Sequence, residues 1–123
     1  MKRFFYPFPK VFFALLFMFS VTLARSGEIP VKGTVTLFDL GASSCVPCKM
    51  MAPILEKLER EYSGRAAIIF IDVWKNVKEA RKYGIRSIPT QILYDASGKE
   101  RYRHTGFWSE LEIKEMLDLL LEP

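Results

Sequence analysis

The chain has 123 residues, half of them hydrophobic, with eighteen Lys and Arg against fourteen Asp and Glu and a formal net charge of +4. Four of the basic residues precede Gly27, so fourteen basic and fourteen acidic residues remain after them, and this neutral balance implies neither nucleic acid nor an anionic membrane surface as a partner. Two cysteines and a single histidine also fall short of the four ligands that structural zinc requires.

Residues 1–26 are expected to form a signal peptide or an N-terminal membrane anchor. Lys2, Arg3 and Lys10 precede the uncharged, mostly apolar run 11–24, and this arrangement is typical of a secretory signal peptide. The run is shorter than the roughly 20 residues that span a bilayer. Because counting back to residue 4 lengthens it, a membrane anchor formed by residues 4–24 stays the alternative. We expect an exported protein, in the bacterial periplasm, with one domain.

Residues 27–123 alternate between expected strands and helices. Apolar and alternating runs predict strands, and helical spacing of apolar residues predicts helices. The expected strands are Val35–Leu40, Ala66–Val73, Thr90–Tyr94 and Lys99–Thr105, and the expected helices are Val46 to about Tyr62, Asn76–Tyr83 and Trp108–Leu121. Their order predicts an α/β fold with a mixed central sheet of about four strands flanked by helices.

The last expected helix has a recognisable start and an expected inner face. Ser109 followed by Glu112 three residues later forms a capping-box pattern. Its inner face is expected to carry Leu111, Leu120 and one of the adjacent residues Met116 and Leu117.

Cys45 and Cys48 are the two cysteines of the chain, and the intervening Val46 and Pro47 place the thiols about one helical turn apart. The pair lies between an expected buried strand and an expected amphipathic helix, and a Cys-x-x-Cys pair at such a junction is typical of a redox site. The free N–H groups and the positive dipole end of the helix stabilise a thiolate, the species that attacks another disulfide.

Other roles for the two cysteines are less compatible with the sequence. Covalent haem attachment requires a histidine directly after the second cysteine, and Lys49 occupies this position. A purely structural disulfide across so short a loop removes little chain entropy from the unfolded state. We therefore expect Cys45, at the helix start, to be the nucleophile and Cys48 to be the thiol that resolves the mixed disulfide. Pro47 suits the first helical turn and limits the flexibility of the loop.

The segment Cys45–Met50 resembles the active-site run of the thioredoxin family, with Val46 where thioredoxins usually have glycine. Pro53 matches a proline within the equivalent helix. Residues 83–90, with the sequence Tyr-Gly-Ile-Arg-Ser-Ile-Pro-Thr, resemble the segment that carries the family's cis-proline. The resemblance covers nearly all of residues 27–123 and implies a thioredoxin-like fold.

The chain also departs from the thioredoxin pattern around the cysteines. Ser44 and Gly41 stand where the family has tryptophans, and Ile68 stands where it has a lysine near a buried acid. Asp39, six residues before Cys45, matches that acid. The surface of the active site and the electrostatics around Asp39 are therefore expected to differ from those of cytosolic thioredoxin.

The resemblance implies roles for three further residues. Asp39 would be buried, with a raised pKa, and would exchange a proton with Cys48; the alternative is a strand-end aspartate that accepts backbone hydrogen bonds near the surface. Pro89 would be cis and would expose the backbone of Ile88 for strand-like pairing with a substrate chain, together with contacts from Val46 and Pro47; the alternative is an ordinary edge or turn proline.

The remaining aromatic residues are interpreted as structural. Trp74 is expected to be a partly buried packing residue at a strand end, with a place in the substrate surface as the alternative. Phe107 and Trp108 are expected in the core or at the entry to the last helix, and His104 is expected to face solvent.

The function that these features predict is thiol–disulfide exchange outside the cytoplasm, without a metal or an organic cofactor. We expect a monomeric reductase of disulfide-containing protein substrates, recharged by a membrane electron donor. The alternatives are an oxidant or isomerase of secreted proteins, and a binding or chaperone module that uses the same fold without turnover. The direction of electron flow depends on a reduction potential that the sequence does not supply.

Overall fold

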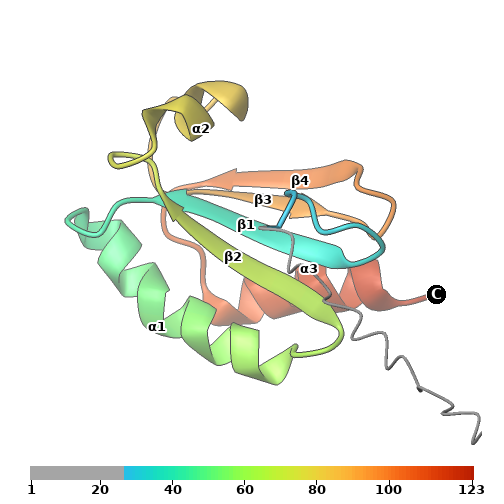
Figure 1. Ribbon diagram of the computed structural model, residues 1–123. Helices are drawn as coiled ribbons and strands as arrows, with labels where there is room; N and C mark the ends of the chain where they lie inside the picture. Colours follow the sequence, from blue (N-terminus) through green and yellow to red (C-terminus); the bar gives the residue numbers. More distant parts are fainter. Residues whose placement is uncertain (1–26) are drawn as a thin grey trace, which may run out of the picture.

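The structure is a computed structural model that describes residues 27–123 (Figure 1). The predicted signal peptide or anchor, residues 1–26, lies outside the described part. Among the described residues, none of the helices has the length and apolar character needed to cross a membrane.

Within residues 27–123, four strands form one mixed sheet. In space the order is β2 (Ala66–Asp72), β1 (Val35–Gly41), β3 (Thr90–Tyr94) and β4 (Glu100–Thr105). β1 pairs with β2 in parallel and with β3 antiparallel, and β3 and β4 form an antiparallel hairpin. The predicted mixed four-strand sheet is therefore confirmed. β1 has a strand on each side, and all seven of its residues are buried.

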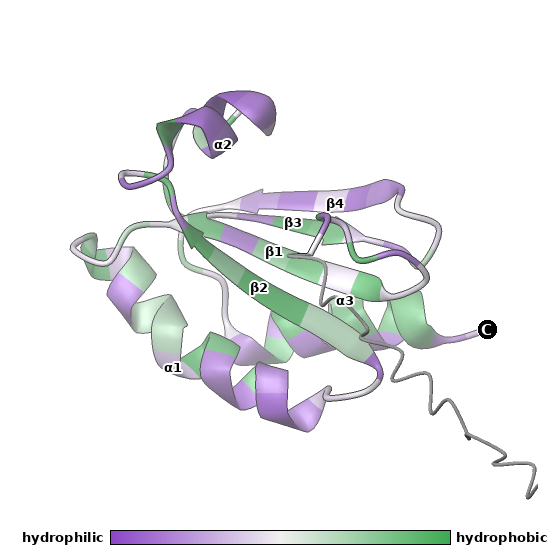
Figure 2. Cartoon of the chain, in the orientation of Figure 1, coloured by the Kyte–Doolittle hydropathy of each residue, from purple (hydrophilic) through white to green (hydrophobic). Residues whose placement is uncertain are grey.

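The described part of the chain has three helices, and they cover the sheet. α1 (Val46–Glu61) and α3 (Glu110–Leu121) lie on one face, and the short α2 (Val77–Lys82) lies on the other (Figure 1). β1 serves both faces, because its alternate residues point to opposite sides: Leu37 joins the cluster under α1 and α3, and Phe38 joins the cluster under α2. Figure 2 shows β2 as hydrophobic along most of its length, while α1 alternates between hydrophobic and hydrophilic residues.

The helix boundaries follow the caps that the sequence supplies. α3 starts at Glu110 behind the predicted capping box of Ser109 and Glu112, and this box is present. The expectation that Leu111 faces inward is wrong, since its side chain is 68% exposed. Ile113 and Leu117, one helical turn apart, are fully buried instead, and Leu111 lies about 200° around the helix from Ile113.

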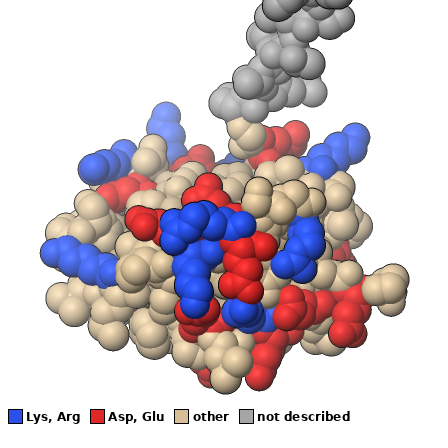
Figure 3. All heavy atoms as spheres, turned by 90° about the horizontal axis from the view of Figure 1, so that it is seen from below, with Lys and Arg blue, Asp and Glu red and all other residues tan. Residues whose placement is uncertain are grey.

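The outer surface of α1 and α3 carries charges of both signs. Figure 3 shows Lys and Arg interspersed with Asp and Glu on this face of the molecule. Two ion pairs join the helices: Lys57 lies 2.6 Å from Glu110, and Lys114 pairs with Glu61. Exposed pairs of this kind add only about 0–1 kcal/mol each. The core clusters are therefore the main contribution to holding the helices on the sheet.

Candidate active site

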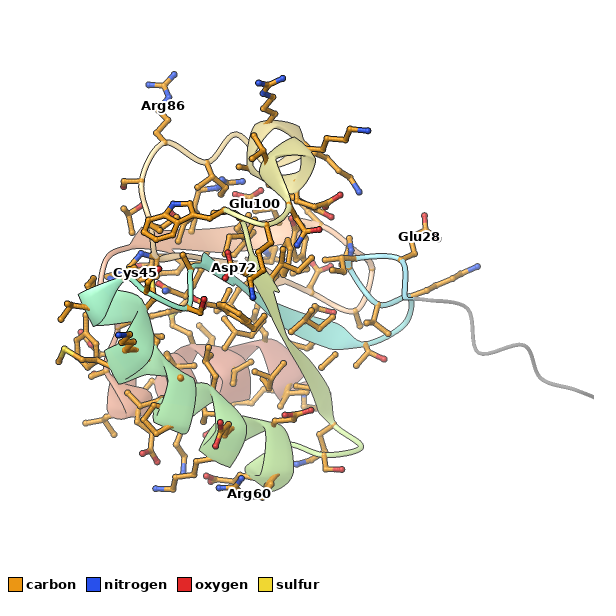
Figure 4. The ribbon with its side chains drawn as sticks, turned by 60° about the vertical axis from the view of Figure 1, so that its left-hand side comes forward. Glu28, Cys45, Arg60, Asp72, Arg86 and Glu100 are labelled. Atoms are coloured by element: carbon orange, nitrogen blue, oxygen red, sulfur yellow. A yellow bond between two sulfur atoms is a disulfide. The ribbon has the colours of Figure 1, made fainter. Side chains whose placement is uncertain are left out.

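Cys45 and Cys48 form a disulfide at the N-terminal end of α1, and their Cα atoms lie 5.2 Å apart. Cys45 is the N-cap residue, and its Sγ accepts a hydrogen bond of 3.3 Å from the backbone N–H of Cys48. This contact places the sulfur at the positive end of the helix, which favours the thiolate once the disulfide is reduced. Figure 4 shows Cys45 at this end of α1, with Arg60 at the opposite end.

The two sulfur-bearing residues differ in exposure. Cys45 is half-buried, whereas Cys48 is only 5% exposed. Val46 beside Cys45 is 70% exposed, and the half-buried Pro47 occupies the first turn of the helix. A protein substrate can therefore approach Cys45 across Val46, while Cys48 is shielded behind it. This is the arrangement that a nucleophile followed by a resolving thiol requires.

Asp39 is a buried carboxyl group in the middle of the sheet, 1% exposed. Its Oδ1 accepts a hydrogen bond of 2.7 Å from Nε2 of Gln91, the residue opposite it on β3. Its Oδ2 and the Oε1 of Gln91 are buried and have no hydrogen-bond partner among the described residues. Burial raises the pKa of Asp39 from its ordinary value of 3.8 to about 6, and the hydrogen bond from Gln91 opposes the rise.

The geometry of β1 brings Asp39 to the same face as the disulfide. Alternate residues of a strand share a face, so Asp39 and Gly41 point in the same direction. A Cβ at Gly41 would come within 3.2 Å of both Cys48 Sγ and the ring of Phe70. The sulfur of Cys48 therefore lies against the backbone one position beyond Asp39 on that face. The same contacts explain why a large side chain is missing at position 41, since Cys48 and Phe70 fill the space.

Pro89 and Ile88 lie at the same end of the sheet as the disulfide. Thr90, which follows Pro89, pairs with Leu40 at the end of β1. The peptide bond between Ile88 and Pro89 is cis, and the Pro89 carbonyl accepts a hydrogen bond of 2.8 Å from the backbone N–H of Gly106. Within residues 27–123, the backbone N–H and C=O of Ile88 make no hydrogen bond. They are therefore free to pair with an incoming chain.

A surface hollow of about 530 Å³ lies next to Cys48, between α1 and β2. Its lining includes Cys48, Leu55 and Phe70. No group of three or more His, Cys, Asp or Glu residues that could hold a metal ion occurs within residues 27–123.

These features agree with the comparisons to known proteins. The family model described as Thioredoxin matches residues 26–118. The chain belongs to the thioredoxin family. Thioredoxins of several Staphylococcus aureus strains, among them Mu50 and MW2, are 41% identical to it over 88 residues, which is 72% of this chain and 84% of theirs. The solved structure of a mutant thioredoxin from Halobacterium salinarum NRC-1 is similar with a TM-score of 0.66 at 33% identity, covering 74% of this chain and 78% of that one.

As a member of the thioredoxin family, the protein is a thiol–disulfide oxidoreductase whose redox-active pair is Cys45 and Cys48. Thioredoxins act on disulfide-containing protein substrates, and the redox step is an exchange of bonds between sulfurs. In the roles predicted from the sequence, the thiolate of Cys45 attacks a substrate disulfide, forms a mixed disulfide and releases one substrate thiolate. Cys48 is then predicted to attack Cys45 Sγ, which releases the second substrate thiolate and leaves the Cys45–Cys48 disulfide.

Two residues of this site were not singled out from the sequence. Gln91 is fully buried and binds Asp39, and Asp72 at the end of β2 accepts hydrogen bonds from Ser43 in the loop before Cys45. A glutamine in an expected buried strand was a signal for the first, because buried polar side chains need partners. Its partner could be named only with the register of β3 against β1.

Proposed function

We propose that this thioredoxin-family protein works outside the cytoplasm as a monomeric reductase of protein disulfides and is recharged by a membrane electron donor. The main support for the reducing direction is the position of Asp39, which is buried on the face of β1 that contacts Cys48. A strongly oxidising dithiol protein is one whose reduced form is stabilised. Here a buried carboxylate opposes negative charge on the dithiol, and this favours release of electrons and formation of the disulfide.

The residues between the cysteines support the same direction. Val46 and Pro47 carry no charge, so within the dithiol loop only the helix start stabilises a thiolate. A histidine or a basic residue between the cysteines would add a further stabilising charge and make the protein more oxidising.

An equilibrium titration against glutathione tests the direction. We expect a reduction potential of about −270 mV, as in reducing thioredoxins, rather than about −120 mV, as in a strong oxidant. A value at the oxidising end would overturn the reductase proposal. Reduction of insulin by dithiothreitol, with the Cys45→Ser protein as control, tests turnover itself. Absence of any acceleration by the unchanged protein would favour a binding module.

The location outside the cytoplasm is supported by Lys2, Arg3 and Lys10 ahead of the apolar run 11–24. Cell fractionation of the full chain should recover the protein outside the cytoplasm. Leu16→Arg interrupts the apolar run, and this variant should stay in the cytoplasm at full length. Recovery of the unchanged chain in the soluble cytoplasm would contradict the proposal, and full-length protein in the membrane would identify an anchor formed by residues 4–24.

A further inference from the structure

Trp74 is exposed, contrary to the expectation that it packs at a strand end. Its side chain is 60% exposed, whereas Trp108, the other tryptophan, is 3% exposed in the core. Val73 directly before it is buried under α2, and the chain leaves the sheet where β2 ends at Asp72. Tryptophan combines a large apolar surface with few rotatable bonds, and exposed tryptophans are enriched among the residues that dominate protein–protein binding.

The carboxylate of Asp72 fixes the loop of Trp74 beside the loop that carries the dithiol. Its Oδ1 accepts hydrogen bonds from the backbone N–H groups of Trp74, at 3.0 Å, and Lys75, at 3.3 Å. Its Oδ2 accepts hydrogen bonds from the backbone N–H and the hydroxyl of Ser43, at 3.1 and 2.9 Å. The Asp72 carboxylate therefore bridges the two loops through hydrogen bonds, and Ser43 is two residues from Cys45. Figure 4 shows Asp72 and Cys45 at the same end of the molecule.

The surroundings of Cys45 leave room for a neighbouring apolar contact. The residues before it, Ser43 and Ser44, are exposed and small, so they offer a substrate little apolar surface. Val46 follows it at 70% exposure. Trp74 thus adds a large apolar side chain from a different loop to the end of the molecule where Val46 already faces solvent.

We propose that Trp74 contacts the protein substrate and favours chain segments with apolar side chains next to their reactive cysteine, and that Asp72 is the positioning residue that holds it beside the dithiol. The inference rests on the thiol–disulfide exchange of the family and is independent of the direction and location proposed above. It adds a specificity determinant and changes no step of the chemistry.

Kinetics with two substrates test the contact. For Trp74→Ala, kcat/KM toward a protein disulfide should fall about three- to tenfold more than the rate constant toward bis(2-hydroxyethyl) disulfide, which has no flanking chain. The loss should appear mainly in KM, and Trp74→Phe should restore most of it. Leu119→Ala is the matched control, because Leu119 is 61% exposed on α3, outside the site. An equal loss for both substrates, or none, would overturn the proposal.

Fluorescence of a trapped intermediate gives a readout that does not depend on turnover. The Cys48→Ser protein is joined by a mixed disulfide to a peptide with one cysteine flanked by leucines, or to the same peptide with serines. Acrylamide quenching should report Trp74, since Trp108 is buried, and Trp74→Phe supplies the signal of Trp108 alone. The leucine peptide should protect Trp74 from acrylamide more than the serine peptide. Equal quenching in the two adducts would contradict the contact.

The positioning role of Asp72 is tested by Asp72→Asn, which keeps one carbonyl oxygen and loses the second acceptor. We expect KM for the protein substrate to rise and the difference in protection between the two peptide adducts to shrink. Asp95→Asn is the matched control, because Asp95 accepts comparable turn hydrogen bonds from Ser97 and Lys99 in the β3–β4 hairpin. Unchanged KM and unchanged protection in Asp72→Asn would show that Trp74 does not depend on Asp72.

Discussion

Asp39 combines burial in the sheet with a place on the face that meets Cys48. A carboxyl group with a pKa of about 6 is divided between its two protonation states near neutral pH. It can therefore accept the proton of Cys48 as this thiol attacks the mixed disulfide, and return it later. The unpaired Oδ2 is the atom on which this proton can reside, because Oδ1 is already bound to Gln91.

Asp39→Asn should slow resolution of the mixed disulfide near neutral pH, with a smaller effect on the initial attack by Cys45, because the amide cannot accept the proton.

The Asp39→Asn change should also affect the stability of the fold. The folded-state pKa is raised from 3.8 to about 6, so the contribution of Asp39 to stability is present below about pH 4 and is lost as the pH rises through 6. As the pH rises between these two values, the free energy of unfolding of Asp39→Asn should increase by about 3 kcal/mol relative to that of the native protein.

Urea unfolding of the disulfide forms at several pH values measures this gain. A loss of several kcal/mol in Asp39→Asn at neutral pH, with unchanged disulfide exchange, would show that Asp39 is a structural hydrogen-bonding residue.

Gln91→Met should raise the pKa of Asp39 above about 6, because methionine has a similar shape and cannot donate the hydrogen bond that stabilises the carboxylate. The pH profile of mixed-disulfide resolution should move to higher pH by the same amount. A carboxyl titration followed by NMR measures the pKa directly. Thr90→Val, beside Gln91 on β3, is a control that removes a buried hydroxyl without touching Asp39. An unchanged or lower pKa in Gln91→Met would contradict the role of Gln91.

At the scale of elements, α1 gives the two cysteines different environments. The helix start supports the Cys45 sulfur, while Cys48 is buried within the first turn. Cys45→Ser should abolish activity, whereas Cys48→Ser should accumulate covalent mixed disulfides, because attack still occurs and resolution does not. Nonreducing gels of cell extracts separate the two outcomes. Accumulation of adducts by Cys45→Ser alone would mean that the two roles are reversed.

In the reduced protein, alkylation of Cys45 should titrate below the free-thiol pKa of about 8.5, because its sulfur lies at the N-terminal end of α1. The rate of reaction with iodoacetamide against pH measures this pKa, and Cys48→Ser isolates the signal of Cys45. A curve centred at the free-thiol value would contradict activation by the helix start.

The elements themselves could be predicted where one periodic signal decided them. The continuous apolar run at the start of β2 and the capping box of α3 predicted their elements to within two residues. The inner face of α3 does not follow from the sequence alone, because Leu111, Ile113 and Leu117 are all apolar and the buried face depends on what the helix packs against. The exposure of Trp74 does not follow from the sequence for a related reason: an aromatic residue after a strand is usually buried, and here the chain turns outward after Asp72, whose carboxylate accepts a hydrogen bond from the Trp74 N–H.

Gln91 could not be connected with Asp39 without the topology. The two residues are 52 positions apart and meet because β3 returns antiparallel beside β1. The roles of Asp39, Ile88, Pro89, Val46 and Pro47 stay predictions that only the experiments above can test.

For the whole molecule, the expected domain boundary near Gly27 predicts that residues 27–123 fold alone. The segment before β1 is tied to the rest of the domain. The Tyr83 hydroxyl donates a hydrogen bond of 3.2 Å to the Ile29 carbonyl, and the Val31 N–H donates one of 3.1 Å to Oγ1 of Thr36. Ile29 also packs against the cluster under α2. A chain that begins at Gly27 keeps these contacts, and a chain that begins at Thr34 loses them.

Thermal unfolding of the two chains in their disulfide forms tests the boundary. Residues 27–123 should unfold in one cooperative transition, as single domains of this size usually do. The chain beginning at Thr34 should be less stable by about 2 kcal/mol, which lowers Tm by roughly 8–16 °C. Equal midpoints would show that the domain begins after residue 33. A broad, non-cooperative transition of residues 27–123 would show that the fold requires part of the segment before Gly27.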